Sequence, residues 1–441
     1  MQRLSAEQPS PNMDGHLYDL KMAEASSSCL LTDLNGAPLS PGLCARALGR
    51  DGEGVACEIV PGTELRQAGS HSALLRDARD AAAPSSSLVF LKKVTASFVA
   101  HKPWNDRRRV LLYIRNEQRF YAEFADELRA RRVGIPAARL HVAAGLDGIE
   151  ELEDEPPAAR LEGAGAMLFI EPLADGRFEQ LSPLSPRQAR HVLAAAARLH
   201  AAAWEARAVL QRGATRLQRH GGSFALAARN PKELQGLPAS WERFVAAFTP
   251  AAPPGFFARP QIASLGRRLA AAAVWVAARL SPSPLDAHAT LVHGDLKAMN
   301  VFLPTGEGGE AVLIDFASTG VGFGVADVAL HLVHALSPAD LDGGGEEALL
   351  DSYLDALAAA RGGAADAAPY PRSLALRHYQ LATIDYGRFM VGRFWGSASP
   401  ASFAAKAGNE NIALPNRDLG SALRFVERLS ACLAALEPEI S

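Results

Sequence analysis

The sequence predicts an α+β fold of two lobes, a small strand-rich lobe followed by a large and mostly helical one. Apolar strand patterns at 55–60, 88–91 and 166–170 surround a single strongly helical segment at 106–131. After Pro186 the sequence becomes Ala-rich and keeps helical periodicity. Strands grouped before helices are typical of α+β proteins, and a chain of 441 residues is longer than one hydrophobic core usually supports.

These changes of pattern divide the chain into three segments. Residues 1–50 contain scattered prolines and a serine tract, and we expect an N-terminal extension with short helices and no chemistry. Residues 51–172 are expected to form the small lobe, and residues 173–441 the large lobe. Within the large lobe, 212–260 shows no clear periodicity and is predicted to be irregular, as an insertion would be.

The bulk composition argues against a nucleic-acid or membrane partner. The formal net charge is −3, so no overall basic field attracts polyanions. The N-terminus has no apolar stretch of signal-peptide length, and the longest apolar run, 269–278, is too short to cross a bilayer. The four cysteines have no metal-ligand or disulfide spacing, which fits a reducing compartment. We therefore expect a soluble cytoplasmic protein.

The strongest motif is HGDLKAMN at 293–300, followed by IDF at 314–316. Apolar residues precede and follow the first motif, so it is expected to be a loop between two buried strands, and a third apolar strand leads into the second. Phosphoryl transfer needs a carboxylate to accept a hydroxyl proton and oxygen ligands for Mg²⁺. Asp295 is predicted to be the catalytic base, while Asn300 and Asp315 are predicted to hold the metal.

Two other residues of the first motif have predicted roles in the site. Lys297 can neutralise charge that develops on the transferred group. His293 is expected to tie the loop to the backbone near Asp315.

HGDLKAMN followed by IDF resembles the aminoglycoside phosphotransferase and choline kinase superfamily, and most closely its choline-kinase-like group, which includes the ecdysteroid kinases. The segment 197–204, ARLHAAAW, is similar to the LHA-x-x-W helix end of that group. The segment 320–329 is similar to the part that follows the metal ligand, where the acid, here Asp327, braces the catalytic loop. The resemblance covers about 54–436. It implies a bilobal protein-kinase-like fold, with ATP and Mg²⁺ as cofactors and a small hydroxylated molecule as substrate.

The small lobe supplies candidates for nucleotide binding. Lys92 closes the strand at 88–91, where a lysine can reach the α- and β-phosphates. Glu117, on the helix that follows, is the best partner to orient this lysine. Lys93 competes with Lys92 for the same role.

A turn-rich hinge follows the strand at 166–170. If Ile170 guards the adenine pocket, the Glu171 carbonyl and the Leu173 N–H can bond the adenine edge. No GxGxxG motif is present to cover the phosphates, and the best substitute is GSHS, with Ser70 and Ser72.

The acceptor site is expected in the C-terminal helical region. Asp385, Tyr386 and Trp395 can form a cage for an ammonium group. Equally, these side chains can simply pack the helix onto the lobe. The sequence does not decide between an amino alcohol, a sugar, an aminoglycoside and a steroid-like alcohol, and it does not indicate an oligomeric state.

Two other functions compete with a small-molecule kinase. A protein serine/threonine kinase would also place Lys297 and Asn300 at this spacing, but Gly294 replaces the arginine of its loop. Asp315 and Asp327 are also too close for an activation segment that lays out a peptide. A silent nucleotide-binding pseudokinase is disfavoured because the predicted base and metal ligands are all present. We therefore predict ATP-dependent transfer of a phosphoryl group to a small-molecule hydroxyl.

Overall fold

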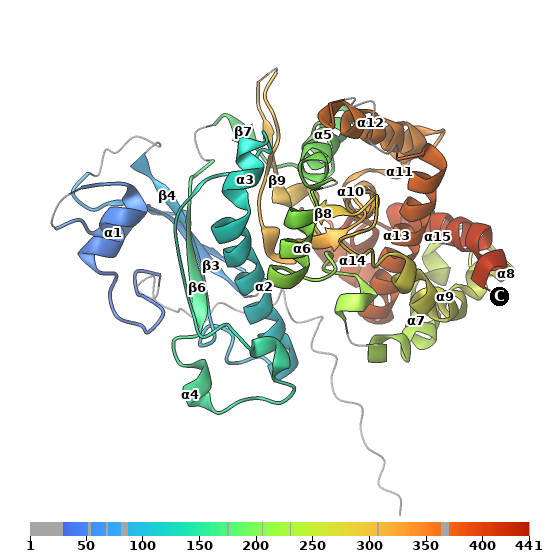
Figure 1. The fold of residues 1–441 in the computed structure, drawn as a ribbon. Coiled ribbons are helices and arrows are strands. Elements are labelled where there is room, and N and C mark those ends of the chain that lie inside the picture. Colours follow the sequence, from blue (N-terminus) through green and yellow to red (C-terminus); the bar gives the residue numbers. More distant parts are fainter. Residues whose placement is uncertain are drawn as a thin grey trace, which may run out of the picture.

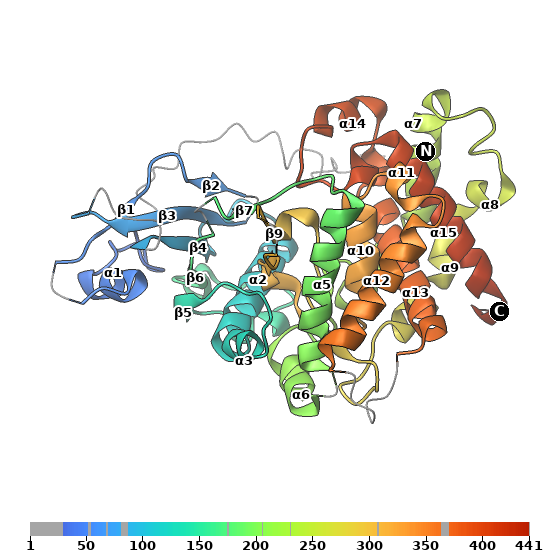
Figure 2. The ribbon, with the colours of Figure 1, turned by 90° about the horizontal axis from the view of Figure 1, so that it is seen from above.

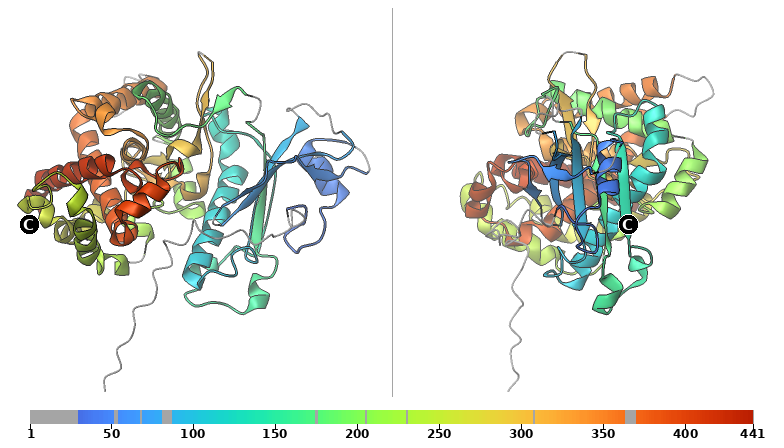
Figure 3. Two further views of the ribbon diagram at one scale, coloured as in Figure 1. Left: turned by 180° about the vertical axis from the view of Figure 1, so that it is seen from behind. Right: turned by 90° about the vertical axis from the view of Figure 1, so that its left-hand side faces the viewer.

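The chain folds into two lobes that lie side by side, as Figure 1 shows in a computed structural model. The structure describes residues 30–51, 54–67, 69–80, 87–173, 176–204, 206–229, 231–306, 308–362 and 370–440. The small lobe contains an antiparallel sheet, and the large lobe is mainly helical. Figure 3 shows the same division from behind and from the small-lobe side. The predicted α+β fold of two lobes is confirmed.

The sheet of the small lobe has the strand order β1-β3-β4-β6-β5, and β2 pairs with β3. All of its pairs are antiparallel, so side chains directly opposite each other share a face. Its strands are β1 (Cys57–Ile59), β2 (Leu65–Arg66), β3 (His71–Asp77), β4 (Val89–Thr95), β5 (Ala138–Ala144) and β6 (Gly165–Ile170).

Helices cover both faces of this sheet. The helices of the small lobe are α1 (Pro41–Leu48), α2 (Trp104–Glu123), α3 (Ala125–Ala130) and α4 (Ala158–Leu161). Leu91 pairs with Phe169, and both pack in one cluster with residues of α1. One position later, Lys92 pairs with Leu168 on the opposite face, where Leu168 packs in the cluster that includes α2. Figure 1 shows α1 and α2 on opposite sides of the strands.

The segment that begins at Leu30 is part of this lobe. Leu30, Cys44 and Leu48 are buried against Leu75 and Leu91 of the sheet. The helix α1 begins where the Ser40 side chain accepts a hydrogen bond from the Leu43 N–H. The predicted N-terminal extension therefore differs from the structure over residues 30–48, because apolar side chains there complete the face of the sheet away from α2. Residues 1–29 lie outside the described residues.

The large lobe is built around long helices that pack on one another. In α5, Ser185 and Gln188 form a capping box and Pro186 occupies the first turn, which explains where the helix starts. Figure 2 shows α5 beside α12, with which it packs closely. The helices are α5 (Pro186–Ala203), α6 (Arg207–Arg216), α7 (Leu237–Phe248), α8 (Pro260–Ala263), α9 (Leu265–Arg279), α10 (Val325–Ala335), α11 (Pro338–Leu341), α12 (Gly345–Ala360), α13 (Arg372–Arg393), α14 (Pro400–Lys406) and α15 (Leu419–Ile440).

Two small antiparallel sheets at the face toward the small lobe carry the motifs. One has the order β10-β9-β7, and the other pairs β11 with β8. The loop that contains HGDLKAMN lies between β8 and β9, as predicted from its apolar flanks. The strands are β7 (Phe178–Glu179), β8 (Thr290–Val292), β9 (Val301–Pro304), β10 (Val312–Leu313) and β11 (Gly320–Gly322).

Among the residues that the structure describes, no helix combines the length and the apolar character that crossing a bilayer requires.

Candidate active site

The catalytic loop is held from behind by a buried acid on α10. The Asp327 carboxylate accepts hydrogen bonds from the backbone N–H groups of His293 (2.7 Å) and Gly294 (2.8 Å). His200 of α5 contacts the same carboxylate through Nε2 at 3.0 Å. Burial would raise the pKa of Asp327, but the bond to His200 lowers it below the ordinary value. The brace that the sequence resemblance implied for Asp327 is present.

Gly294 allows the sharp turn that precedes Asp295. Its φ of +82° is in the left-handed region, and a Cβ there would lie 2.1 Å from the Ser318 carbonyl oxygen. A side chain at this position would therefore clash with the segment that follows Asp315.

Asp295 lies at the end of this turn with three polar neighbours. Its Oδ1 accepts a hydrogen bond from the Ser223 hydroxyl at 3.3 Å. Its Oδ2 accepts one from the Asn300 amide nitrogen at 3.3 Å and lies 3.8 Å from Lys297 Nζ. The carboxylate is thus partly exposed and oriented by Ser223 and Asn300.

His293 and Asn300 join the catalytic loop to the neighbouring strands. The His293 ring contacts the Ile314 carbonyl at 2.8 Å, which is the tie near Asp315 that the sequence predicts. Asn300 donates its amide N–H to the Asp295 carbonyl oxygen at 2.9 Å. Because the nitrogen makes these contacts, the amide oxygen is the atom that can coordinate a cation.

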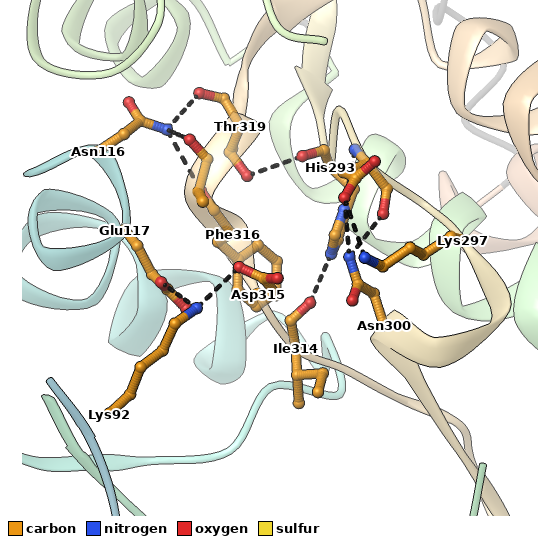
Figure 4. A network of polar contacts seen from close by, with 12 residues as sticks. Lys92, Asn116, Glu117, His293, Lys297, Asn300, Ile314, Asp315, Phe316 and Thr319 are labelled. Atoms are coloured by element: carbon orange, nitrogen blue, oxygen red, sulfur yellow. Dashed lines mark hydrogen bonds and ion pairs between the residues drawn. The ribbon is translucent and has the colours of Figure 1, made fainter. Parts of the chain in front are cut away.

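Asp315 projects from the opposite side of the site in a special backbone conformation. Its φ of +65° is uncommon for a residue with a side chain, and it starts the 3₁₀ helix Phe316–Ser318. The ring of Phe316 stacks on Phe120 of α2 at 3.9 Å between centroids. Asn116 of α2 donates to the carbonyl oxygens of Phe316, Ala317 and Thr319 at 3.0–3.2 Å, so α2 fixes the segment that carries Asp315 (Figure 4).

Lys92 links the two lobes through two carboxylates. Its Nζ lies 2.7 Å from Glu117 Oε2 and 2.9 Å from Asp315 Oδ1, as Figure 4 shows. The predicted pairing of Lys92 with Glu117 is therefore present. Lys93 is on the other face of the sheet, where its Nζ donates to the carbonyl and hydroxyl oxygens of Thr32 at 2.7 and 2.8 Å. Alternation along β4 thus directs Lys92, and not Lys93, toward the site.

Lys92 acts to lower the pKa of both its carboxylate partners, but the two pKa values differ in the direction of their shift. Burial raises the pKa of Glu117 to about 7, although Lys92 opposes this shift. For Asp315, burial also acts to raise the pKa, but Lys92 and Lys297 together lower it to about 2. The Asp315 carboxylate is therefore ionised at neutral pH.

The predicted hinge lies directly after β6. Ile170 is buried at the end of β6, and Glu171 donates its N–H to the Ala137 carbonyl at 2.8 Å. Leu173 is half-buried in the connection that leads toward β7. These positions are compatible with adenine contacts by the Glu171 carbonyl and the Leu173 N–H, which stay predictions.

Ser70 lies in the turn between β2 and β3, and Ser72 is the second residue of β3. Ser72 pairs directly with Lys92, so the two side chains share a face of the sheet. Gly69 packs on α2, since a Cβ there would lie 2.8 Å from Val110 Cγ1. Ser72 thus lies beside Lys92, and contacts of Ser70 and Ser72 with phosphates stay predictions.

The three side chains predicted to bind the acceptor are buried. Asp385 pairs with Arg388 at 2.7 Å and accepts from the Leu226 N–H at 3.3 Å. Trp395 is 0% exposed, and its indole N–H donates to Asn416. Tyr386 is 4% exposed and packs on Phe224. These contacts fit the packing alternative, because an ammonium cage needs exposed aromatic faces.

Sequence reasoning missed three residues of the site. Asn116 had a weak signal, as a polar residue on the same side of the helix as apolar ones. Ser223 and Tyr113 had none, because only the fold brings them to Asp295. The half-buried Tyr113 of α2 has a pKa that burial raises, and the charge of Asp295 acts in the same direction, which indicates that the two groups are near each other.

The family model of the phosphotransferase enzyme family matches residues 104–370, more than half of the chain. The chain belongs to this family. The phosphotransferase is accordingly a small-molecule kinase whose acceptor is an alcohol group, and this membership favours it over a protein kinase. None of the curated proteins matches its sequence significantly.

Several solved structures are similar to the phosphotransferase at low identity. A microcompartment-associated aminopropanol kinase is 14% identical, with 88% of this chain and 94% of that chain covered and a TM-score of 0.46. A choline kinase from Cryptosporidium parvum is 11% identical, with 90% and 96% covered and a TM-score of 0.42. An amicoumacin kinase is 12% identical, with 85% and 90% covered and a TM-score of 0.45. Similarity at this level does not identify an acceptor.

The oxygen donors of the site fit a magnesium ion bound together with a nucleotide. The described residues contain no cluster of three or more His, Cys, Asp and Glu side chains that could hold a metal alone. Asp315 and the Asn300 amide would supply only part of an octahedral shell. Mg²⁺ commonly takes one or two protein oxygens and completes its shell with phosphates and water, so this donor set suits a Mg·nucleotide complex.

Proposed function

We propose that the phosphotransferase is an ATP- and Mg²⁺-dependent kinase, which transfers the γ-phosphoryl group to a hydroxyl of a small molecule. The acceptor classes are an amino alcohol, an aminoglycoside, a sugar or a steroid-like alcohol. The observation that supports this proposal best is the ion pair of Lys92 with Asp315, which brings a phosphate-binding cation and a metal-binding carboxylate together. The predicted second metal ligand, Asn300, donates to the carboxylate of the predicted base, Asp295.

Each group then has a role in the reaction. Lys92, oriented by Glu117, binds the α- and β-phosphates, while Ser70 and Ser72 lie where the remaining phosphate contacts are needed. The Mg²⁺ held by Asp315 and Asn300 neutralises phosphate charge when it is bound. Asp295 accepts the proton of the acceptor hydroxyl, and Lys297 stabilises charge on the transferred group. His293 keeps the loop in place.

The proposal is tested by ADP release from Mg·ATP over a panel of choline, ethanolamine, aminoglycosides, sugars and sterols. General-base help is worth about 10²–10⁴ in rate, so we expect Asp295→Asn to bind Mg·ATP normally and to turn over slower by about this factor. Acceptor-dependent ADP that disappears in this variant would support the proposal and name the acceptor class. Near-normal turnover by Asp295→Asn would remove Asp295 as the base. Mg·ATP binding without any turnover would favour the silent nucleotide-binding alternative.

A further inference from the structure

A serine of the protein itself occupies the acceptor side of the predicted base. The Ser223 hydroxyl donates to Asp295 Oδ1 at 3.3 Å, while Oδ2 of the same carboxylate contacts Asn300 and Lys297. Among the described residues, it is the only hydroxyl with a hydrogen bond to Asp295. A substrate hydroxyl that gives its proton to Asp295 would need a contact of the same kind.

The backbone keeps Ser223 at this position. Its N–H donates to the Gly294 carbonyl at 2.9 Å, so it is tied to the residue that precedes Asp295. The preceding Gly221 and Gly222 donate to the carbonyls of Val321 and Ser318 at 2.9 and 3.0 Å. Ser223 is also only half-buried, so a bound nucleotide can approach its side chain.

A guanidinium group lies beside Ser223. Arg229 Nη1 donates to the Ser223 carbonyl at 3.2 Å, and its guanidinium also lies over the ring of Phe389. Arg229 is paired with Glu233 at 2.5 Å, which offsets part of its charge. Because it contacts the backbone of Ser223, Arg229 can donate to a phosphate formed on the Ser223 side chain.

We propose that Ser223 is an internal phosphate acceptor, which the enzyme phosphorylates when no substrate occupies the site. The Ser223 oxygen forms a bond to the γ-phosphorus of ATP, while the bond between that phosphorus and the β–γ bridging oxygen breaks. The hydroxyl proton moves to Asp295, and ADP leaves with the electron pair of the broken bond. This inference rests on the proposed function, which supplies ATP and the base.

Phosphoserine at this position would fill the place of the acceptor hydroxyl. Self-phosphorylation and acceptor turnover should therefore exclude each other at one site. An acceptor present from the start should slow the modification, and the modified enzyme should turn over its acceptor poorly.

Intact-mass measurement on the full chain with Mg·ATP and no acceptor tests this inference. We expect a gain of one phosphoryl group per chain, which peptide mass spectrometry locates on Ser223. Ser223→Ala should gain none, and Ser223→Thr should keep the reaction. Asp295→Asn should slow it by about 10²–10⁴-fold. Ser264→Ala is the matched control, because Ser264 is also half-buried but donates to the Pro260 carbonyl, away from the site.

Two results would overturn the inference while the proposed function stands. One is an enzyme that turns over an acceptor but keeps its unmodified mass after long incubation with Mg·ATP. The other is phosphate on a different residue, or modification that persists in Ser223→Ala. A protein that binds no Mg·ATP would instead overturn the proposed function, and this inference with it.

Discussion

At the residue scale, the site depends on one ammonium group shared by two carboxylates. Glu117 is 1% exposed, so its charge has no water to stabilise it and relies on Lys92. Asp315 is more exposed and lies near Lys297 as well. The buried partner therefore protonates first, with a pKa of about 7, while Asp315 stays ionised down to about 2. A lysine held in this way is always charged and fixed in direction, which suits phosphate binding.

The raised pKa of Glu117 predicts a pH dependence of stability. A carboxyl group whose pKa rises on folding, here from 4.5 to about 7, adds stability below the lower value and loses it as the pH passes through the higher one. The pKa of Asp315, about 2, is below the range between these two values. Asp315 therefore contributes a constant amount to the unfolding free energy within that range. We therefore expect wild type to lose stability between about pH 5 and about pH 8 relative to Glu117→Gln, as measured by urea unfolding. Glu242→Gln, at an exposed position of α7, should follow wild type. Parallel curves for wild type and Glu117→Gln would contradict the prediction.

Substitution of Asn116 should lower both the stability of the chain and its affinity for Mg·ATP. Asn116→Ala removes the amide that donates to three carbonyl oxygens around Phe316, but each of these oxygens keeps another donor. The loss is therefore that of net hydrogen bonds, at about 0.5–1.5 kcal/mol each. We expect a loss of this size in the free energy of unfolding, together with weaker Mg·ATP binding in calorimetry because Asp315 is displaced. Gln118→Ala removes an exposed amide from the same helix and should change neither. If stability falls while Mg·ATP binding is unchanged, Asn116 contributes to folding and not to the nucleotide site.

The residues that sequence could predict are those with a local signature. HGDLKAMN and IDF place Asp295, Asn300 and Asp315 on loops after short apolar strands, and the structure keeps that order. Ser223 could not be predicted, because its contact with Asp295 spans 72 positions and depends on hydrogen bonds between backbone segments. Asp385 and Trp395 were expected to bind the acceptor, but they are buried. A mixture of aromatic and charged residues has the same sequence pattern in a core as in a pocket.

At the element scale, the largest difference from the sequence prediction is α7. The segment 212–260 was expected to be irregular, yet Leu237–Phe248 is helical. Trp241, Phe244 and Phe248 recur at helical spacing and are buried, so the periodicity was present over a short window. A second difference is the helix predicted at 106–131, which breaks at Phe124 into α2 and α3 because φ there is −128°. Strand β4 also runs past Lys92 to Thr95, since its pairing with β6 continues.

Helix α10 carries the acid that holds the catalytic loop, and its substitution should change both stability and turnover. Its first turn presents Asp327 to two backbone N–H groups and to His200, so both carboxylate oxygens are used. Asp327→Asn replaces one acceptor by an N–H₂ group that faces a donor, and we expect a loss of about 1–3 kcal/mol in unfolding free energy. Turnover should fall further than Mg·ATP affinity, because the displaced loop carries Asp295. Urea unfolding and acceptor kinetics measure the two effects, and the exposed Asp355→Asn on α12 serves as control. Normal turnover in a folded Asp327→Asn would show that the brace is dispensable.

At the scale of the whole molecule, the lobes share one apolar cluster and also meet through specific polar contacts. Asn116 and Phe120 of α2 hold the segment 316–319, and Lys92 of the sheet reaches Asp315. The sequence predicted two lobes and the pairing of Lys92 with Glu117. It did not predict that residues 30–48 complete the back of the sheet, because a short amphipathic helix with scattered apolar residues has no signature of its partner.

Because the site uses side chains from both lobes, nucleotide binding should stabilise the whole chain. A ligand at about 100 times its Kd adds about 2.7 kcal/mol to the unfolding free energy, so we expect Mg·ATP to raise the melting temperature by several degrees. Asp315→Ala removes a proposed metal ligand and one partner of Lys92, and its melting temperature should not respond to Mg·ATP. Asp342→Ala removes a surface partner of Arg424 far along the chain from the motifs, and it should keep the full response. An equal rise in Asp315→Ala, confirmed by unchanged affinity in calorimetry, would mean that the nucleotide binds without Asp315 and would remove it from the metal site.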